Sequence, residues 1–177
     1  MLAARRWDTK PNPDAMLVLL HGLGASAEDL APLAEAIATR ARIGMRIVLP
    51  EAPARRVTIA DGYPMQAWYD IRSLAFTEDE DVSGIRAAIQ SVHALLDAET
   101  MRGIHPARIV LGGFSQGAAL SLAAGLRYRA SLAGIVAFSG YLPLADALAS
   151  ELAPEARRTP IWIGHGTEDD LVPVADP

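Results

Sequence analysis

Five short apolar runs, separated by longer segments of mixed polarity, constrain the fold of this chain more than any other feature. The runs cover residues 16–20, 46–49, 108–111, 134–138 and 160–163. They are continuous rather than alternating, which is typical of strands that helices cover on both faces. The order of runs and longer segments therefore predicts an α/β fold, with a mostly parallel sheet and helices on both of its faces.

Three segments between the runs predict helices packed on this sheet. Residues 26–42 open with Ser26 as an N-cap and carry apolar side chains at helical spacing. Residues 81–101 repeat the same spacing and stop at Gly103. A third helix should open at Gln116, where small residues allow close approach to the strands.

The segment of residues 49–77 differs from the rest of the chain. It contains several prolines and a glycine, and no long periodic pattern. We predict an extended surface excursion, a type of segment that often builds binding sites.

Length and composition limit the class of protein. At 177 residues, the prediction is one domain spanning residues 1–177. Charged residues make up 21% and the net charge is −5, so we expect no nucleic-acid partner. No apolar run reaches the length of a membrane span, so we expect no integral membrane segment and a cytoplasmic location. The chain has no cysteine, which excludes disulfides and thiolate chemistry, and its oligomeric state cannot be read from the sequence.

The sharpest chemical signal is the sequence Gly113-Phe114-Ser115-Gln116-Gly117. It follows a predicted buried strand and precedes a predicted helix of small residues, which is the strand–turn–helix setting of a nucleophile elbow. The helix N-terminus places positive potential beneath the serine oxygen. We predict that Ser115 is a nucleophile; the alternative is a glycine-rich turn in which the serine is only an N-cap.

A second signal is the sequence LHGLG at residues 20–24, directly after the first predicted buried strand. Acyl transfer requires two N–H donors aimed at the developing oxyanion, one from the residue after the nucleophile and one from such a loop. The pattern nominates the main-chain amides of Gln116 and Leu23. We interpret the His21 side chain as a structural group that holds the loop, and no ligand spacing indicates a metal site.

A third signal is the sequence HGTEDDLVP at residues 165–173, after the last predicted strand. A carboxylate at the end of a strand downstream of the serine is where a triad acid belongs. Among Glu168, Asp169 and Asp170, we assign this role to Asp169. The alternative is an acidic loop that caps the turn after it.

These motifs together resemble the phospholipase/carboxylesterase family of α/β-hydrolases, which includes bacterial carboxylesterases and acyl-protein thioesterases. The resemblance covers essentially the whole chain, through LLHGLG, LPEAP, AWYD, RIVLGGFSQG, FSGYLP and HGTEDDLVP. It implies an α/β-hydrolase fold and hydrolysis of carboxylic esters or thioesters through a serine acyl-enzyme, without metal or cofactor. In that scheme Ser115 attacks, Asp169 is the acid, and the amides of Leu23 and Gln116 bind the oxyanion.

The resemblance also implies that the excursion from Trp68 to Phe76 lines an acyl-binding groove. Both residues are therefore predicted to bind substrate, which would be a small-molecule ester or an acylated partner. For Trp68 an alternative stays open, because a large aromatic side chain also anchors a long loop to a core.

The chain departs from the family pattern at the catalytic histidine. That residue lies beyond the triad acid, after one more strand, whereas the sequence ends eight residues past Asp169. We expect His93 and His105 to lie too far from the serine, and His21 and His165 to belong to other motifs. We therefore expect a fold without its last strand and closing helix, and a chain that is inactive because it lacks the catalytic base.

Two other functions are compatible with the motifs. An acyltransferase would use the same acyl-enzyme and exclude water, and a hydrolase-like binding protein would catalyse nothing. The motifs specify neither the acyl length nor the leaving group.

Overall fold

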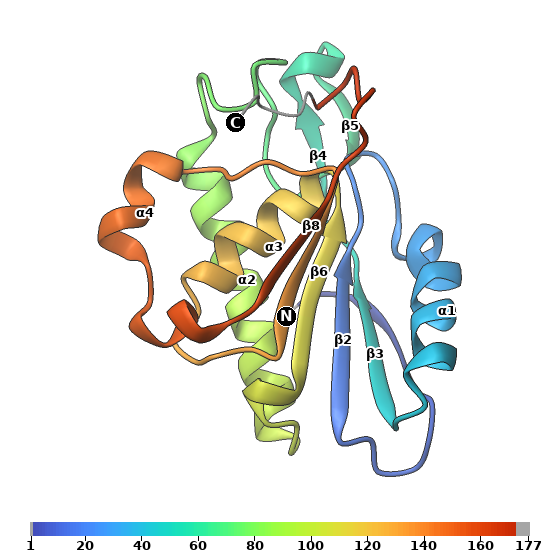
Figure 1. The fold of residues 1–177 in the computed structure, drawn as a ribbon. Helices are drawn as coiled ribbons and strands as arrows, with labels where there is room; N and C mark the ends of the chain where they lie inside the picture. Colours follow the sequence, from blue (N-terminus) through green and yellow to red (C-terminus); the bar gives the residue numbers. More distant parts are fainter. Residues whose placement is uncertain (1, 173–177) are drawn as a thin grey trace.

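A sheet of parallel strands forms the centre of the molecule (Figure 1). The computed structural model describes residues 2–172. Within them the strand order is β1-β3-β2-β6-β7-β8. The strands are β1 (Ala4–Asp8), β2 (Ala15–Leu20), β3 (Met45–Pro50), β6 (Ile109–Phe114), β7 (Gly134–Phe138) and β8 (Ile161–Gly164). Only the pair β1 and β3 is antiparallel in this described sheet.

Helices cover both faces of this sheet, as the sequence predicts (Figure 1). One face packs on α1 (Ala31–Ala41), and the other packs on α2 (Val82–Met101) and α3 (Gln116–Leu126). Side chains of β2 alternate between the two cores: Leu17 and Leu19 lie on the α1 side, and Met16 and Val18 on the other. No helix in residues 2–172 has the length and apolar character needed to cross a membrane.

Smaller elements connect these layers. Helix α4 (Ala145–Glu151) follows β7, and 3-10 helices occupy Ala27–Leu30, Thr58–Ala60, Pro106–Arg108 and Pro154–Arg158. The predicted helix over residues 26–42 is therefore a 3-10 turn followed by α1. The predicted helix over residues 81–101 is confirmed, with Asp81 as its N-cap accepting a hydrogen bond from the N–H of Gly84.

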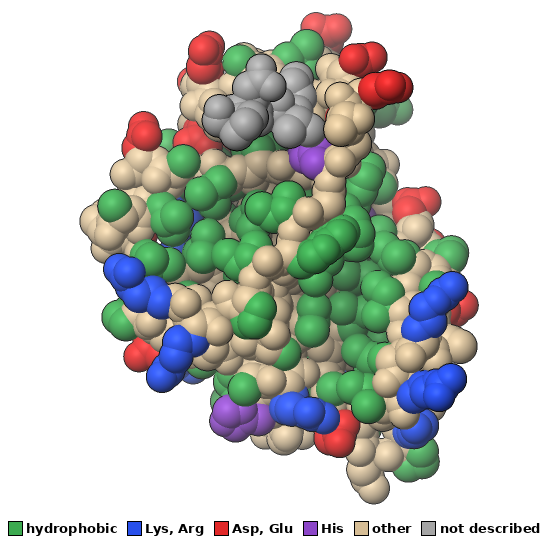
Figure 2. Space-filling view, in the orientation of Figure 1, with side chains coloured by type: hydrophobic (Ala, Val, Ile, Leu, Met, Phe, Trp, Pro, Cys, Tyr) green, Lys and Arg blue, Asp and Glu red, His purple; other side chains and the backbone are tan. Residues whose placement is uncertain are grey.

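Strand β8 corrects one prediction. Its apolar run suggested a strand covered on both faces, but β8 is an edge strand of the described sheet. Ile161, Trp162 and Ile163 are 45%, 54% and 58% exposed. Figure 2 shows hydrophobic side chains gathered in the middle of this face of the molecule. An apolar run alone does not distinguish a central strand from an edge strand.

The excursion of residues 49–77 is also more ordered than predicted. It contains an antiparallel hairpin of β4 (Ala54–Val57) and β5 (Tyr63–Gln66). After the hairpin the chain turns inward, so that Ala67, Trp68 and Tyr69 are buried in the core beside α2 and α3. The segment is therefore a surface hairpin followed by a buried anchor.

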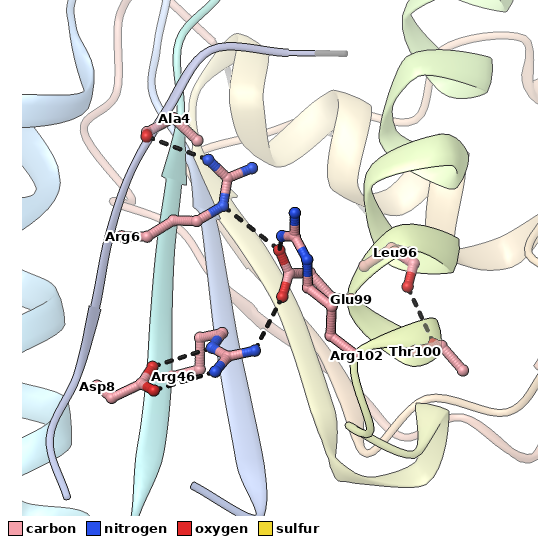
Figure 3. A network of polar contacts seen from close by, with 8 residues as sticks. All are labelled: Ala4, Arg6, Asp8, Arg46, Leu96, Glu99, Thr100 and Arg102. Atoms are coloured by element: carbon pink, nitrogen blue, oxygen red, sulfur yellow. Dashed lines mark hydrogen bonds and ion pairs between the residues drawn. The ribbon is translucent and has the colours of Figure 1, made fainter. Parts of the chain in front are cut away.

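An ion-pair cluster joins the outer strands to the end of α2 (Figure 3). The Glu99 carboxylate is fully buried and contacts the guanidinium groups of Arg6, Arg46 and Arg102 at 3.3, 3.2 and 2.6 Å. Arg46 also pairs with Asp8 on β1 at 2.9 Å, which holds the pKa of that carboxyl below its usual value. The cluster fixes α2 against β1 and β3, away from the loops that follow the parallel strands.

Candidate active site

Ser115 lies at a sharp turn between β6 and α3, with φ +52° and ψ −119°. A residue other than glycine at positive φ is strained and occurs mostly where the surrounding structure holds it. The N–H of Ser115 donates to Phe138 O at 2.9 Å, and Ser115 O accepts from the N–H of Ala119 at 3.0 Å. The strand, strained serine and helix form the predicted elbow.

The two motif glycines allow this turn to sit against β2. A Cβ on Gly113 would lie 2.5 Å from the main-chain carbonyl carbon of Gly117, and a Cβ on Gly117 would overlap the carbonyl group of Leu20. Larger residues would push α3 away from the strands. The glycines are therefore required by backbone approach, as well as by the turn itself.

The loop after β2 lies beside the nucleophile. A Cβ added to Gly22 would be in ordinary contact with the Cβ of Ser115, at 3.4 Å. Within residues 2–172, the N–H groups of Leu23 and Gln116 donate no hydrogen bond. The first amides of a helix have no intrahelical acceptor, which accounts for Gln116. Two unbonded donors next to a serine are what an oxyanion site requires.

His21 holds this loop from inside, as its structural interpretation predicts. Its ring is fully buried, and its Nε2 accepts a hydrogen bond from the N–H of Ala52 at 3.1 Å. Because Nε2 is the acceptor, Nδ1 carries the proton and donates to Gly22 O at 2.8 Å. Through these two bonds His21 bridges the loop and the end of β3, and its Nε2 also lies 3.4 Å from Glu51 Oε1.

Trp68 and Gln116 complete the support of the loop. The indole N–H of Trp68 donates to His21 O at 2.8 Å. The Gln116 side chain accepts from the N–H of Trp68 at 3.0 Å and donates to Tyr69 O at 2.8 Å. We predicted a role only for the main-chain amide of Gln116. Its side-chain role depends on contacts 47 positions apart, which no local motif indicates.

Asp169 follows β8, at the same edge of the sheet as Ser115. Its Oδ1 accepts from the N–H groups of Leu171 and Val172 at 3.1 and 2.9 Å, and its Oδ2 lies 3.5 Å from His165 Nε2. The N–H of Val172 contributes most to lowering the pKa of this carboxyl. Asp169 is thus ionised near neutral pH, and its Oδ2 is free of main-chain donors in the described residues.

The four histidines are all engaged elsewhere. His21 bonds Gly22 and Ala52, and Nε2 of His93 contacts Ala124 O at 2.8 Å on the inner side of α2. His105 caps the 3-10 turn before β6, at the opposite end of that strand from Ser115. His165 Nε2 donates to Val172 O at 2.6 Å. Within residues 2–172, no imidazole forms a hydrogen bond with the Ser115 hydroxyl.

A cavity of about 320 Å³ opens beside Ser115. Its wall is mostly apolar and draws on the excursion, the elbow and the segments after β2, β7 and β8; it includes Leu23, Ile59, Ile71, Leu74, Phe76 and Phe114. No group of three acidic or histidine side chains in the described residues is arranged to hold a metal. The cavity suits an apolar group attached to the atom that Ser115 attacks.

The two predicted substrate-binding aromatics have different positions. Phe76 lies in the cavity wall. Trp68 is 2% exposed and lies outside that wall, bonded to the loop of His21. The prediction that Trp68 lines the groove is therefore wrong, and its position fits the alternative role of a loop anchor.

Comparisons with known proteins agree with this geometry. The phospholipase/carboxylesterase family matches residues 8–176. Acyl-protein thioesterase 1 of Schizosaccharomyces pombe is 43% identical over 159 residues, covering 90% of this chain and 70% of that protein. Acyl-protein thioesterase 1 of Yarrowia lipolytica is 37% identical over 171 residues, covering 96% of this chain and 75% of that protein.

Solved structures give the same result. The crystal structure of Arabidopsis thaliana SOBER1 superposes with a TM-score of 0.82 at 32% identity, covering 90% of this chain and 77% of that one. Zea mays acyl-protein thioesterase 2 gives a TM-score of 0.77 at 30% identity, covering 96% and 78%. By sequence and by structure, this chain belongs to the phospholipase/carboxylesterase family of α/β-hydrolases, and this membership makes it a carboxylic ester hydrolase.

Proposed function

We propose that Ser115 is the nucleophile of an enzyme that cleaves carboxylic esters or thioesters through an acyl-enzyme. Its Oγ bonds to the substrate carbonyl carbon, and the alcohol or thiol leaves with a proton. Water then adds to the acyl-serine and releases the carboxylic acid and the free serine. The observation that carries this proposal is a strained serine at positive φ beside two unbonded N–H groups.

The amides of Leu23 and Gln116 are proposed to stabilise the oxyanion of the tetrahedral intermediate. Two features support this role: both are unbonded within residues 2–172, and hydrogen bonds of the His21, Trp68 and Gln116 side chains fix their positions. Fixed donors need no reorganisation when charge develops, which is why such sites lower the barrier.

The proposed substrate carries an apolar acyl group. The wall around Ser115 is largely hydrocarbon and includes Phe76, which we keep as a substrate-binding residue. Relatives named acyl-protein thioesterase support an acylated partner as one possible substrate, and relatives named carboxylesterase support a small ester.

The mechanism also requires a general base that accepts the Ser115 proton. Each of the four imidazoles bonds to a group other than Ser115, so residues 1–177 by themselves are expected to acylate slowly. Oxyanion binding alone leaves about three orders of magnitude over water. Asp169, whose Oδ2 accepts no main-chain hydrogen bond in the described residues and lies 3.5 Å from His165 Nε2, is proposed to orient the imidazole that takes the Ser115 proton.

Added imidazole tests the nucleophile. We expect turnover of 4-nitrophenyl butyrate by the 177-residue protein to be weak, and to rise with imidazole concentration beyond the rate that imidazole gives alone. The Ser115→Ala variant should lose this increase entirely, whereas Ser139→Ala should keep it. Mass spectrometry after a fluorophosphonate probe should place the adduct on Ser115. A label on Ser139, or an imidazole effect that survives in Ser115→Ala, would make the assignment wrong, and no effect in either protein would favour a binding protein.

The same assay tests the acid. In Asp169→Asn the imidazole concentration needed for half-maximal rate should rise about tenfold or more, because a hydrogen bond to a charged acceptor is lost. Asp170→Asn and Glu168→Gln are matched controls that remove a neighbouring charge and should have little effect. An unchanged imidazole dependence in Asp169→Asn would contradict the role.

A further inference from the structure

A pair of tyrosines, one of which lines the cavity, meets beside it through their hydroxyl groups. The hydroxyl oxygens of Tyr69 and Tyr141 are 2.8 Å apart, although the residues are 72 positions apart in sequence. Tyr69 follows the hairpin and is fully buried, whereas Tyr141 follows β7 and lies in the cavity wall. The Tyr141 ring stacks on Phe76, with ring centres 5.1 Å apart and planes at 25°.

The contact has one direction that satisfies both hydroxyl groups. Only one of the two protons can lie between the two oxygens. In residues 2–172 the Tyr69 hydroxyl has no other hydrogen-bond partner. If Tyr141 donated, the Tyr69 proton would be buried without an acceptor, which costs about 1–3 kcal/mol. Tyr69 therefore donates to Tyr141, and the Tyr141 proton remains available.

The available proton stays on Tyr141 at neutral pH and has no competing acceptor in the described residues. Burial raises the pKa of Tyr141 to about 12, so the hydroxyl is neutral and can donate. Glu80 also faces the pair and raises the pKa of both tyrosines. Its carboxylate, however, accepts from the N–H of Leu144 at 2.9 Å and bonds neither hydroxyl.

Tyr141 is thus distinct among the groups of the cavity wall. The Ser115 hydroxyl is the proposed nucleophile, and both polar atoms of the Gln116 side chain are bonded to the main chain of residues 68 and 69. The remaining side chains of the described wall are hydrocarbon. Beside the two amides assigned to the oxyanion, the Tyr141 hydroxyl is thus an unused side-chain donor, suited to an acceptor atom in the molecule that fills the cavity.

We propose that Tyr141 is a specificity-determining residue, which donates a hydrogen bond to an oxygen carried within the acyl or leaving group of the substrate. The preferred ligands are esters or thioesters with an ether, hydroxyl or keto oxygen along the chain, rather than plain hydrocarbon chains. That these ligands are esters or thioesters rests on the proposed function, whereas the available hydroxyl proton of Tyr141 does not. Removal of the donor should lower affinity for the oxygen-containing ligand about tenfold.

The test measures binding without turnover, so that its outcome is independent of catalysis. In the Ser115→Ala protein, calorimetry gives Kd for 4-nitrophenyl pentanoate and for two esters of equal length, the 3-methoxypropanoate and the 2-ethoxyacetate. For at least one of the two ether esters, the ratio of its affinity to that of the pentanoate should be higher in the Ser115→Ala protein than in the double variant that also carries Tyr141→Phe. Tyr141→Phe should leave pentanoate affinity unchanged and weaken the preferred ether about tenfold.

Tyr69→Phe is the matched control for direction. If Tyr69 is the donor of the pair, its removal leaves the Tyr141 proton free, and the ether preference should persist. A preference that increases in Tyr69→Phe would mean that Tyr141 had been donating to Tyr69, and would overturn the proposal. Equal loss of all three esters in Tyr141→Phe, or no binding of any of them to the Ser115→Ala protein, would also overturn it.

Discussion

The two ends of the sheet are held in different ways. At the end that carries Ser115, the hydrogen bonds that hold the loop of Leu23 run to main-chain groups: His21 bridges two of them, Trp68 donates to a carbonyl, and the Gln116 amide bonds two more. Near the amino end of β3, the support is ionic, with Glu99 buried among arginines. The two ends therefore differ in whether bonds to main-chain groups or ion pairs hold them.

The contrast has a chemical reason. An oxyanion site works only if its N–H donors stay unbonded until the substrate arrives, and a carboxylate placed against them would occupy them. Bonds to main-chain groups fix the loop of Leu23, while the carboxylates of Asp169 and Glu51 accept from other N–H groups, those of Val172 and Ala27. The opposite end has no such requirement, and there a buried carboxylate can be neutralised by Arg6, Arg46 and Arg102 while it ties α2 to the strands.

The largest effect is expected at the serine end, from Gly117→Ala. The added Cβ would overlap the carbonyl group of Leu20, so that α3 and β2 must separate. We expect the free energy of unfolding, measured with urea, to fall by more than about 4 kcal/mol.

Gly134→Ala is the matched control for that substitution. There the nearest atom to an added Cβ is Pro160 O at 3.6 Å, an ordinary contact, and little change is expected. Equal unfolding midpoints for the two variants would mean that the serine end tolerates separation, and that close backbone approach does not define it.

The next effect belongs to the ionic end. Glu99→Gln leaves three guanidinium groups around a neutral amide, and removal of one partner of a buried ion pair costs about 3 kcal/mol or more. Asp8→Asn removes a more exposed carboxylate from the same cluster, and should cost less than about 1 kcal/mol. Urea unfolding measures both.

Glu99→Gln also tests whether the two ends are independent. In the folded protein, the imidazole-dependent ester turnover of this variant should equal that of the unchanged chain. A reduced rate at full folding would mean that the ionic cluster acts on the serine site, and the contrast between the two ends would not hold.

Sequence patterns predicted the apolar strands, the exposed edge strand β8 included, and missed the polar strands β1 and β4. The runs that correspond to β2, β3, β6 and β7 are apolar because these strands are covered, so their composition alone indicates that they are buried. Strand β1 has the sequence Ala-Arg-Arg-Trp-Asp and its burial is partial, and β4 is similar. Such polar edge strands are defined by pairing with distant segments, which local composition does not encode.

The site divides in the same way. The elbow of Ser115 was predictable, because a strand, a glycine-flanked serine and a small-residue helix are consecutive in the chain. The orientation of the Trp68 side chain was not predictable, since its indole N–H donates to a carbonyl 47 positions away. The hydroxyl contact of Tyr69 and Tyr141 likewise joins two loops, and neither loop contains a pattern that indicates the other.

The smallest effect compares two titratable groups on α2 itself. Glu99 is paired with arginines, whereas burial lowers the pKa of His93, whose ordinary value is 6.5, and so favours its neutral form. The imidazole donates to Ala124 O at 2.8 Å and links α2 to α3. Because the folded protein resists protonation of His93 more than the unfolded chain does, this group stabilises the fold fully above pH 6.5 and less as the pH falls below that value.

Urea unfolding at a series of pH values measures this contribution. Between about pH 7.5 and pH 5 the free energy of unfolding should decline, with His93 contributing a slope of at most about 1.4 kcal/mol per pH unit. His93→Gln removes the titration and retains an amide donor for Ala124 O, so its curve should be flatter than that of the unchanged chain. His105→Gln, at an exposed histidine, controls for the general loss of an imidazole and should not flatten the curve. Parallel curves for His93→Gln and the unchanged chain would show that α2 is insensitive to the charge of His93, and that only the ionic end of this helix depends on charge.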